Sequence, residues 1–273
     1  MNLDFIFRAL LRRPFFRGQD RLFNFLFKRK LFNKRECTVV PLNGNFKINC
    51  DPNTWIGARI IFLGDYEPPL KKVFKDHIKA GDQVLDIGAN IGFHTLYFSE
   101  LVGQQGKVTA FEPVPANFEQ LKKNIALNHF QNIETNPVAL SNKNEQLTIA
   151  ADEGSTNPGA YNLFDRNGTI AIDCRIGDEM IGNNRVDFIK IDVEGYESFV
   201  LDGLSQTIEK NRPTIVFEYD QNYQRKTGQA DDVIFKLLGA DRYTFFEIKQ
   251  SGLRQLDQFG SISSGNILAV PNV

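Results

Sequence analysis

The sequence predicts an α/β fold in which a mainly parallel sheet is covered by helices on both faces. After Gly81, short apolar runs alternate with runs of helical length, and this order of strand, helix and strand is typical of such sheets. The chain of 273 residues is long enough for one large α/β domain with additions, or for two small domains. Its 42% hydrophobic and 24% charged residues are ordinary for a globular protein.

The alternating part of the chain contains segments with clear strand or helix character. We expect strands at 83–87, 107–112, 132–138, 186–191, 214–219 and 243–248, and helices at 91–102, 116–128, 197–210 and 231–239. Right-handed crossovers would bring the carboxyl ends of the parallel strands to one edge of the sheet, where such sheets bind their ligands.

Residues 141–176 are less regular than the segments on either side. Two further strands are expected at 146–150 and 169–174. The run between them, ADEGSTNPGAYNLFDRNG at 151–168, is rich in turn-forming residues. We interpret that run as a loop or flap.

The first 35 residues form a basic and aromatic segment. They contain ten Lys or Arg residues against Asp4 and Asp20, a net charge of +8, so the rest of the chain sums to −9. The same segment holds eight phenylalanines. Two interpretations stay open: a helical cap whose aromatic side chains pack on the main domain, or an arm that contacts an anionic membrane surface or an anionic substrate.

Two helices are expected within this segment. The apolar residues of the first have the i, i+3, i+4, i+7 spacing of one helical face: Leu3, Ile6, Phe7 and Leu10. Pro14 would end that helix, because proline cannot continue the hydrogen-bond pattern. The second helix has a broader apolar face, formed by Leu22, Phe23, Phe25, Leu26, Phe27 and Leu31.

A hairpin and a short mixed segment connect these helices to the main domain. Residues 37–50 alternate around Asn43-Gly44, a dipeptide that favours a type I′ turn. Pro68-Pro69 then leads into a helix expected at 70–79. We therefore divide the chain into a helical arm with a hairpin cap at 1–65 and a main domain at 66–273.

The sequence also indicates the cellular compartment in which the protein is expected. No apolar run approaches the roughly 18–20 residues that span a bilayer. Arg8, Arg12 and Arg13 interrupt any signal-peptide core, and no small-residue cleavage site follows. The three cysteines are scattered and odd in number, as expected of free thiols. We therefore expect a cytoplasmic protein, with a peripheral position at a membrane surface as the alternative.

The stretch VLDIGANIGFHT at 84–95 is a candidate ligand-binding loop. It leads from an apolar strand into a helix, and Gly88 and Gly92 allow a sharp turn and the close approach of a ligand. Asn90 tolerates a left-handed backbone almost as well as glycine does. Glu112, 24 residues after Gly88 at the end of the next strand, could accept hydrogen bonds from both hydroxyls of a ribose. The loop and Glu112 together predict a nucleoside-containing ligand.

Asp86 indicates which nucleoside. A carboxylate at that strand end would repel a pyrophosphate but would favour the sulfonium charge of S-adenosylmethionine. The loop also departs from the G-x-G-x-x-G spacing of dinucleotide-binding loops. A loop that only turns the chain and a nicotinamide-type ligand stay as the alternatives.

A second constellation of polar residues lies in IKIDVEGYE at 189–197. Asp192 follows the fourth strand and faces the expected sulfonium, Glu194 lies in the next loop, and Glu218 ends the neighbouring strand. These three carboxylates should converge at the rim of one pocket. Crowding raises the pKa of a carboxyl group, which makes it a better proton acceptor near neutral pH. A purely positioning role is the alternative.

The roles of the neighbouring polar side chains stay open at this point. For Lys190 a buried ion pair with Asp192 or Glu218 is favoured, because Lys190 and Asp192 share one strand face. His94 serves either in helix packing or as a proton acceptor. The three carboxylates could hold Mg²⁺, but nothing in their spacing demands it, so no metal is predicted.

Four segments of the sequence resemble motifs of a known family. VLDIGANIGFHT, FEPVPANFEQLKKNI, NPVALS and VDFIKIDVEGYE are similar to segments of the FkbM family of S-adenosylmethionine-dependent methyltransferases, over a region from about Tyr66 to about Tyr219. The resemblance implies a class I methyltransferase (Rossmann-like) fold with a mainly parallel seven-stranded sheet, S-adenosylmethionine as cofactor, and O-methylation of chemically varied substrates. His94 stands where the family commonly has an aromatic or small residue.

The resemblance also assigns residues to parts of the cofactor. Asp86, Gly88, Asn90 and Gly92 would hold its methionine end, Glu112 the ribose, and the backbone around Val138 and Ala139 the adenine. The expected cofactor-binding residues are Asp86, Gly88, Ala89, Asn90, Gly92, Thr95, Glu112, Pro113, Ala139 and Asp192. The expected catalytic residues are Asp192, Glu194, Glu218 and His94.

The expected activity is therefore O-methylation of a hydroxyl group on a saccharide, glycolipid or secondary metabolite. A nucleic-acid substrate is disfavoured, because DVEG stands where amino-methyltransferases carry a D/N-P-P-Y/F turn that grips a flipped base. The rival interpretation is a non-catalytic cofactor-binding or membrane-associated protein whose working surface is the arm at 1–35.

Overall fold

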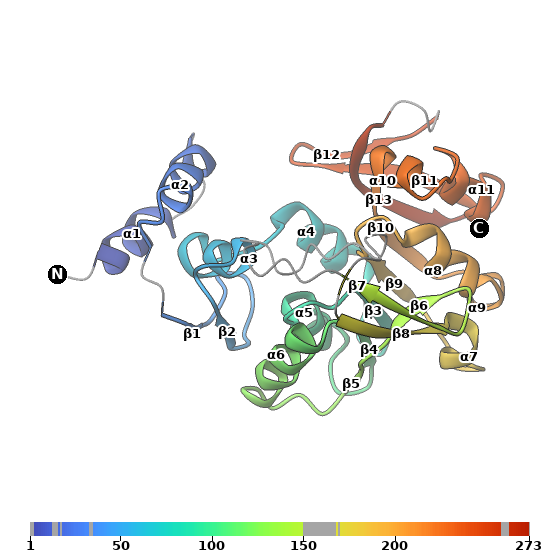
Figure 1. Cartoon of the computed structure of the whole chain (residues 1–273), viewed down its shortest axis with the longest axis horizontal. Coiled ribbons are helices and arrows are strands. Elements are labelled where there is room, and N and C mark those ends of the chain that lie inside the picture. The colour runs from blue at the N-terminus through green and yellow to red at the C-terminus, as the bar shows by residue number, and fades with distance from the viewer. Residues whose placement is uncertain are drawn as a thin grey trace.

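The computed structural model of the chain describes residues 3–12, 16, 18–32, 35–149, 168, 170–257 and 262–272 (Figure 1). Of the loop expected at 151–168, only Gly168 falls within these ranges, and Pro14 lies outside them as well. None of the helices in the described part is long and apolar enough to cross a bilayer.

A large sheet forms the centre of the molecule and confirms the predicted α/β, Rossmann-like class. Its strand order is β12-β11-β13-β10-β9-β3-β4-β5, and neighbouring pairs from β10 to β5 run parallel. The strands are β3 (Gln83–Ile87), β4 (Lys107–Phe111), β5 (Ile133–Asn136), β9 (Phe188–Ile191), β10 (Thr214–Asp220), β11 (Tyr243–Lys249), β12 (Gly252–Gln255) and β13 (Ser264–Pro271).

The antiparallel end of this sheet differs from the prediction in two strands. Strand β13 lies between β10 and β11 and is antiparallel to both. Strand β12 is an exposed edge strand that pairs only with β11 in the described residues, and it makes the sheet eight-stranded rather than seven-stranded. Neither segment was predicted, because 252–255 is short and polar and 264–271 is broken by Gly265 and Pro271.

Helices cover both faces of the sheet, as the sequence predicts. Alternate strand residues enter two different apolar clusters: Val84 and Phe188 on one face, Leu85 and Ile189 on the other. The first cluster includes side chains of α4 (Pro68–His77) and α5 (Phe93–Val102), and the second includes those of α8 (Glu197–Gly203) and α11 (Val233–Leu238). The strands are therefore buried on both sides.

Two helices follow β9 where one was expected at 197–210. Helix α8 ends at Gly203, and α9 (Ser205–Asn211) begins two residues later. A Cβ atom at position 203 would lie 1.9 Å from the carbonyl oxygen of Ser141, so the helix passes directly against a neighbouring backbone there. Helix α6 (Pro115–Ala126) follows β4, α7 (Gly177–Ile181) precedes β9, and α10 (Gln221–Lys226) follows β10.

A second, three-stranded sheet contains the strands expected at 146–150 and 169–174. Strand β7 (Glu145–Ile149) is antiparallel to β8 (Ile170–Ile176), and β6 (Ala139–Ser141) pairs with the other edge of β8. Three buried residues of this sheet, Leu140, Leu147 and Ile172, belong to the apolar cluster that also contains Leu85. The small sheet therefore packs beside the carboxyl ends of β3 and β4.

The hairpin expected at 37–50 forms, but its turn differs from the prediction. Strands β1 (Cys37–Val39) and β2 (Ile48–Cys50) are antiparallel and pair Cys37 with Cys50. Neither Asn43 nor Gly44 has the positive φ that a type I′ turn requires. Residues 40–47 instead form a longer connection, because Asn43 is held by hydrogen bonds with Asp65 and with Lys71 of the main domain.

The two helices near the amino terminus are α1 (Leu3–Leu11) and α2 (Gln19–Lys28), and Figure 1 shows them at one end of the molecule. Their aromatic inner side, together with Phe32, packs on α3 (Trp55–Ala58) and the π-helix η1 (Arg59–Leu63). Phe23 meets Trp55 edge to face at 5.3 Å, and Phe32 stacks on Phe62 at 3.8 Å. Trp55 belongs to α3 and Phe62 to η1. Phe23 and Phe32 also belong to the apolar cluster that contains Val84 and Phe98 of the main domain, which agrees with the cap interpretation.

The faces that these helices bury match the predicted ones only in part: Phe7 of α1 and Leu22, Phe23, Leu26 and Phe27 of α2 pack in one apolar cluster. In α1, Ile6 and Leu10 are exposed, whereas Leu11 is fully buried. In α2, Phe23 and Leu26 are buried and Phe25 is 54% exposed. Helix α1 has apolar residues around most of its circumference, so periodicity alone could not select the side that contacts η1.

Candidate active site

The loop between β3 and α5 has the sharp turn predicted from its sequence. Gly88, Asn90 and Gly92 have φ values of 79°, 51° and 91°, and the side-chain oxygen of Asn90 accepts a hydrogen bond from the Ile91 N–H at 2.8 Å. A Cβ atom on Gly88 would lie 1.8 Å from the carbonyl oxygen of Asp192. Glycine is therefore required at 88 because the chain leaving β9 passes against it.

Asp86, at the start of this loop, is buried in an ion-pair network. Its Oδ2 accepts a hydrogen bond from the Thr95 hydroxyl at 2.6 Å, and its Oδ1 lies 3.5 Å from Nζ of Lys190. Lys190 Nζ also lies 3.3 Å from Oδ2 of Asp192 and donates to the Gly88 carbonyl at 3.0 Å. The favoured ion pair of Lys190 with Asp192 is confirmed, and its pairing with Asp86 was not foreseen.

Glu112 connects the end of β4 to the same loop. Its carboxylate accepts hydrogen bonds from the Asn90 N–H at 2.7 Å and the Val114 N–H at 2.9 Å. Burial raises its pKa to about 7, and these two backbone donors and the Asn117 side chain act in the opposite direction. Each carboxylate oxygen has a second lone pair, so the group can still accept hydrogen bonds from a ligand.

A cavity opens at the carboxyl ends of β3, β4 and β9. Its lining contains five of the expected cofactor-binding residues: Gly88, Glu112, Pro113, Ala139 and Asp192. The other expected residues, Asp86, Ala89, Asn90, Gly92 and Thr95, shape the loop and α5 and are not among the described residues that line the cavity.

The lining of this cavity suits an adenosyl group. Val138, Leu140 and Ile149 supply an apolar wall of the kind that accepts a planar base, and Glu112 supplies acceptors for ribose hydroxyls. Asp192 and Glu194 place carboxylates at the same cavity, where a sulfonium charge would be stabilised. The residues present therefore fit S-adenosylmethionine.

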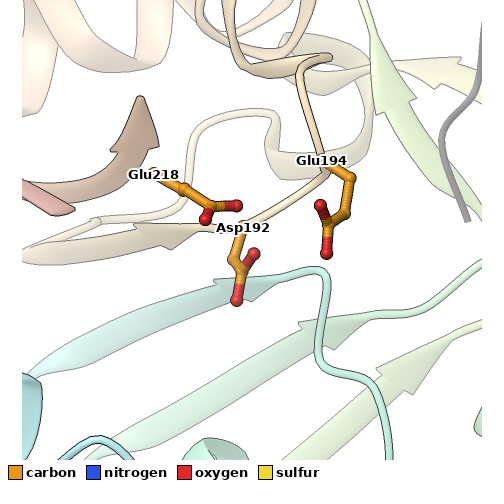
Figure 2. A group of neighbouring side chains, drawn as sticks. All are labelled: Asp192, Glu194 and Glu218. Carbon is orange, nitrogen blue, oxygen red and sulfur yellow. The ribbon is translucent and has the colours of Figure 1, made fainter. Parts of the chain in front are cut away.

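Three carboxylates gather beside the cavity, as the sequence predicts. Figure 2 shows Asp192 and Glu194 on the segment that follows β9, and Glu218 on the neighbouring strand β10, with their carboxylates drawn together. One oxygen from each of the three lies within 4.8 Å of the others. Oxygen ligands at such distances could hold a divalent cation.

The pKa values in this cluster are unequal. Burial, and then the neighbouring Asp192 and Glu194, raise the pKa of Glu218 to about 9. Burial and Asp192 raise the pKa of Glu194 to about 7, while a hydrogen bond from Tyr223 of α10 lowers it. At neutral pH Glu218 is therefore protonated and Glu194 is divided between its two forms. Glu194 is the carboxylate best matched to proton transfer at that pH.

The DVEG turn that carries Asp192 and Glu194 is held by a buried glutamate. Glu194 and Gly195 both have positive φ, 51° and 96°, which is an uncommon conformation for glutamate. Glu197 Oε1 accepts hydrogen bonds from the Val193 and Gly195 N–H groups at 3.2 and 3.1 Å. Burial raises the pKa of Glu197 to about 8. The sequence indicated only that Glu197 opens α8; its hold on the turn was missed, as was the Tyr223 contact.

His94, the fourth expected catalytic residue, lies in an aromatic environment. Its Nε2 is 3.0 Å from Oε2 of Glu67, and its ring has Phe74, Phe93 and Phe98 as neighbours at 5.2 to 6.0 Å. His94 does not line the cavity formed by the described residues. The geometry favours the packing interpretation, with Glu67 as a polar partner that sequence reasoning did not identify.

Four buried or half-buried glutamates predict an unusual pH dependence of stability. Glu112, Glu194, Glu197 and Glu218 have pKa values of about 7, 7, 8 and 9 in the folded chain, above the ordinary 4.5. Each therefore contributes stability below its ordinary pKa, and that contribution is lost as pH rises through the raised value. We expect the Tm to fall between pH 6 and pH 9.

Glu218→Gln tests this dependence, since glutamine keeps the shape of the side chain and cannot ionise. The variant should lose less Tm between pH 6 and pH 9 than the unmodified chain, by roughly 2–5 °C in differential scanning fluorimetry. Glu209→Gln is the matched control, because Glu209 is exposed on α9. Equal losses of Tm in the Glu218 variant and the unmodified chain would contradict the raised pKa of Glu218.

Two fungal methyltransferases are similar to this chain in sequence. The chain is 26% identical over 178 residues to "Methyltransferase sdnD" of Sordaria araneosa, a match that covers 50% of this chain and 68% of that protein. It is 29% identical over 146 residues to "Methyltransferase 1" of Beauveria bassiana (strain ARSEF 2860), covering 44% of this chain and 57% of that protein. The chain thus spans between about half and two thirds of the length of these relatives.

A solved structure of similar architecture is the methyltransferase FkbM from Methylobacillus flagellatus KT. It aligns with a TM-score of 0.46 and 16% identity, covering 77% of this chain and 52% of that one. The family model described as the methyltransferase FkbM domain matches residues 86–246, which is more than half of the chain. That range begins at Asp86, and it contains Glu112 and all three clustered carboxylates. The chain belongs to the FkbM family of S-adenosylmethionine-dependent methyltransferases.

Proposed function

We propose that this protein transfers a methyl group from S-adenosylmethionine to a hydroxyl group of a small molecule, either a saccharide, a glycolipid or another metabolite. The observation that supports this proposal is the position of Glu194, a carboxyl group with a pKa of about 7 at the cavity that fits the cofactor. A hydroxyl acceptor must lose its proton during transfer, and a carboxylate that titrates near neutral pH suits that task.

In this proposal the cofactor lies in the cavity at the ends of β3, β4 and β9. Glu112 would accept hydrogen bonds from the ribose, and Pro113, Val138 and Ala139 would enclose the adenine. Asp192 would face the sulfonium, held in place by its ion pair with Lys190. When bound, S-adenosylmethionine supplies an electrophilic methyl group.

The chain's own residues would then position the acceptor and receive its proton. Glu194 is the proposed proton acceptor, oriented by the hydrogen bond from Tyr223 and by the turn that Glu197 holds. Glu218, with a pKa of about 9, would keep its own proton and so leave one fewer negative charge beside Glu194. Alignment of the acceptor oxygen with the methyl group supplies much of the remaining catalysis in displacements of this kind.

Asp86 has a supporting role in this proposal. It is fully buried, and its carboxylate is occupied by Thr95 and Lys190. Its charge would act on the cofactor through Lys190 and the Gly88 carbonyl rather than by contact. His94 would likewise support α5 against Glu67 and α4 without touching the acceptor.

The test of this function is transfer of radiolabelled methyl groups from S-adenosylmethionine to a panel of acceptors. Sugars, nucleoside-diphosphate sugars, glycolipids, amines and carboxylic acids are compared, and products are treated with mild alkali. Labelled, alkali-stable methyl ethers on hydroxyl acceptors are expected. Transfer confined to amines or carboxylates would contradict hydroxyl methylation, and absence of S-adenosylhomocysteine binding at millimolar concentration would favour the non-catalytic rival.

We also propose a cytoplasmic location. All three cysteines, Cys37, Cys50 and Cys174, are free thiols. Cys37 and Cys50 are direct partners across the β1–β2 pair, and two such cysteines left unjoined are in keeping with a reducing compartment.

A further inference from the structure

Exposed apolar side chains are concentrated at the amino-terminal end of the chain. Ten large hydrophobic side chains are exposed in the described part of the molecule, and seven of them precede residue 43. These seven are Phe5, Ile6, Leu10, Phe25, Leu31, Val40 and Leu42. Phe5 and Phe25 are 74% and 54% exposed. Exposed hydrophobic residues are normally scattered singly over a protein surface, so a concentration of them marks an interaction surface.

The outer face of α2 combines this apolar exposure with positive charge. Arg21, Phe25 and Lys28 are spaced i, i+4 and i+7 along the helix, so they lie on one side of it, and all three are exposed. The guanidinium of Arg29 lies 5.4 Å from the centre of the Phe25 ring. A single aromatic side chain thus projects from a group of cations.

The inner face of α2 packs on the domain, whereas Arg21, Phe25 and Lys28 on its outer face are exposed in the described part of the chain. Phe23 is fully buried against Trp55, and Leu26 is buried on the same side. On α1, Phe5, Ile6 and Leu10 are exposed while Leu11 is buried. Both helices are therefore fixed to the domain by one side. On the other side α1 presents apolar side chains, and α2 presents apolar and basic ones.

The distribution of charge along the chain indicates which kind of partner the exposed side of α1 and α2 binds. Residues 1–35 carry +8, whereas the rest of the chain carries −9. An anionic surface would attract the first segment and repel the remainder, which orients the molecule with α1 and α2 toward that surface. Exposed Phe, Ile and Leu side chains among cations are the composition of helices that lie in the interfacial layer of a bilayer.

We propose that the exposed side of α1 and α2 docks onto an anionic membrane surface, with Phe5 and Phe25 inserted at the level of the lipid headgroups. Arg21, Lys28 and Arg29 pair with lipid phosphates around Phe25. The inference concerns attachment and goes beyond the proposed methyl transfer, whose acceptor it does not specify. No helix crosses the bilayer in this arrangement, so the attachment is reversible and depends on salt.

The proposal is tested by sedimentation of the full chain with vesicles. Vesicles of phosphatidylcholine alone are compared with vesicles of phosphatidylcholine mixed with phosphatidylglycerol. Binding is expected only to the anionic vesicles, and it should weaken as sodium chloride is raised. Since each basic residue near an anionic surface contributes roughly 1 kcal/mol, removing three charges should reduce the partition coefficient by roughly 100-fold.

Substitutions at exposed positions separate the apolar and the basic contributions without disturbing the core. The arm variants are Phe5→Ser with Phe25→Ser, and Arg21→Gln with Lys28→Gln and Arg29→Gln. The matched controls lie elsewhere on the surface and are Leu253→Ser, and Lys122→Gln with Lys123→Gln and Lys236→Gln. Both arm variants should lose vesicle binding, and both controls should retain it.

Three outcomes would overturn the proposal. The first is equal binding to both kinds of vesicle or to neither, and the second is binding that the arm variants retain. The third is a dimer in light scattering that the arm variants dissociate, which would assign the surface to a second copy of the chain. The Tm of each variant is measured alongside, and an unchanged Tm shows that loss of binding is not loss of folding.

Discussion

Glu194→Gln is expected to reduce turnover by roughly 10²–10⁴-fold, the usual contribution of a positioned general base. Glutamine keeps the size of the side chain and can still accept the hydrogen bond from Tyr223, but it cannot take a proton. Because the change removes an interaction needed only in the transition state, the affinity for S-adenosylhomocysteine should stay within a few-fold of the unmodified chain. Steady-state kinetics and calorimetry measure the two quantities.

The pH profile provides an independent readout for the same residue. In the unmodified chain kcat should rise with pH through about 7, the pKa of Glu194, because only the ionised carboxylate accepts a proton. The residual activity of Glu194→Gln should lack that rise. Glu119→Gln, on the exposed side of α6, is the control and should behave as the unmodified chain.

Two results would contradict the assignment of Glu194. Turnover unchanged by Glu194→Gln would show that the residue only lies near the acceptor. Loss of activity on dialysis against EDTA, restored by Mg²⁺, would mean that Asp192, Glu194 and Glu218 act as ligands of a cation. In the proposed mechanism EDTA has no effect, because proton transfer by Glu194 needs no metal.

Glu112→Gln is expected to weaken S-adenosylhomocysteine binding by roughly 10–100-fold in calorimetry. The amide keeps one acceptor oxygen but presents N–H groups where the carboxylate now accepts from Asn90 or Val114. Hydrogen bonds to charged groups contribute about 1.5–3 kcal/mol, so loss of one corresponds to this range of affinity. Glu134→Gln, at an exposed site on β5, is the control.

An analogue of the ligand separates ribose recognition from the support of the loop. The affinities of the unmodified chain and of Glu112→Gln are compared for S-adenosylhomocysteine and for an analogue that lacks the 2′-hydroxyl. If Glu112 contacts the ribose, the difference in affinity between the two chains should be much smaller for the analogue. A difference that is the same for both ligands would mean that Glu112 acts only by holding the backbone of Asn90. Thermal denaturation of the variant confirms that the loop still folds.

The strands and helices that make up the centre of the fold were predictable because their signals are local. The apolar runs at 83–87 and 107–112 indicated strands, and both strands were placed within one residue of their ends. The turn at Gly88 and Asn90 was equally predictable, since only glycine and a few polar residues adopt positive φ easily. The convergence of Asp192 and Glu218 followed from their positions at the ends of neighbouring parallel strands.

Other elements gave weaker or misleading local signals. Asn43-Gly44 is a strong signal for a tight turn, yet hydrogen bonds with Asp65 and Lys71 hold that segment in a longer loop. The face of α1 that packs could not be chosen, because apolar residues surround the helix. In both cases contacts made elsewhere in the fold outweigh a local preference.

By itself the sequence determined the α/β class, the glycine loop, the acidic turn at DVEG and the family, because each depends on residues close together in the chain. Only the tertiary structure decided that Lys190 joins Asp86 to Asp192, that Tyr223 contacts Glu194, and that His94 faces Glu67. These pairings join residues on different elements. Their roles depend on burial and distance, which no local pattern encodes.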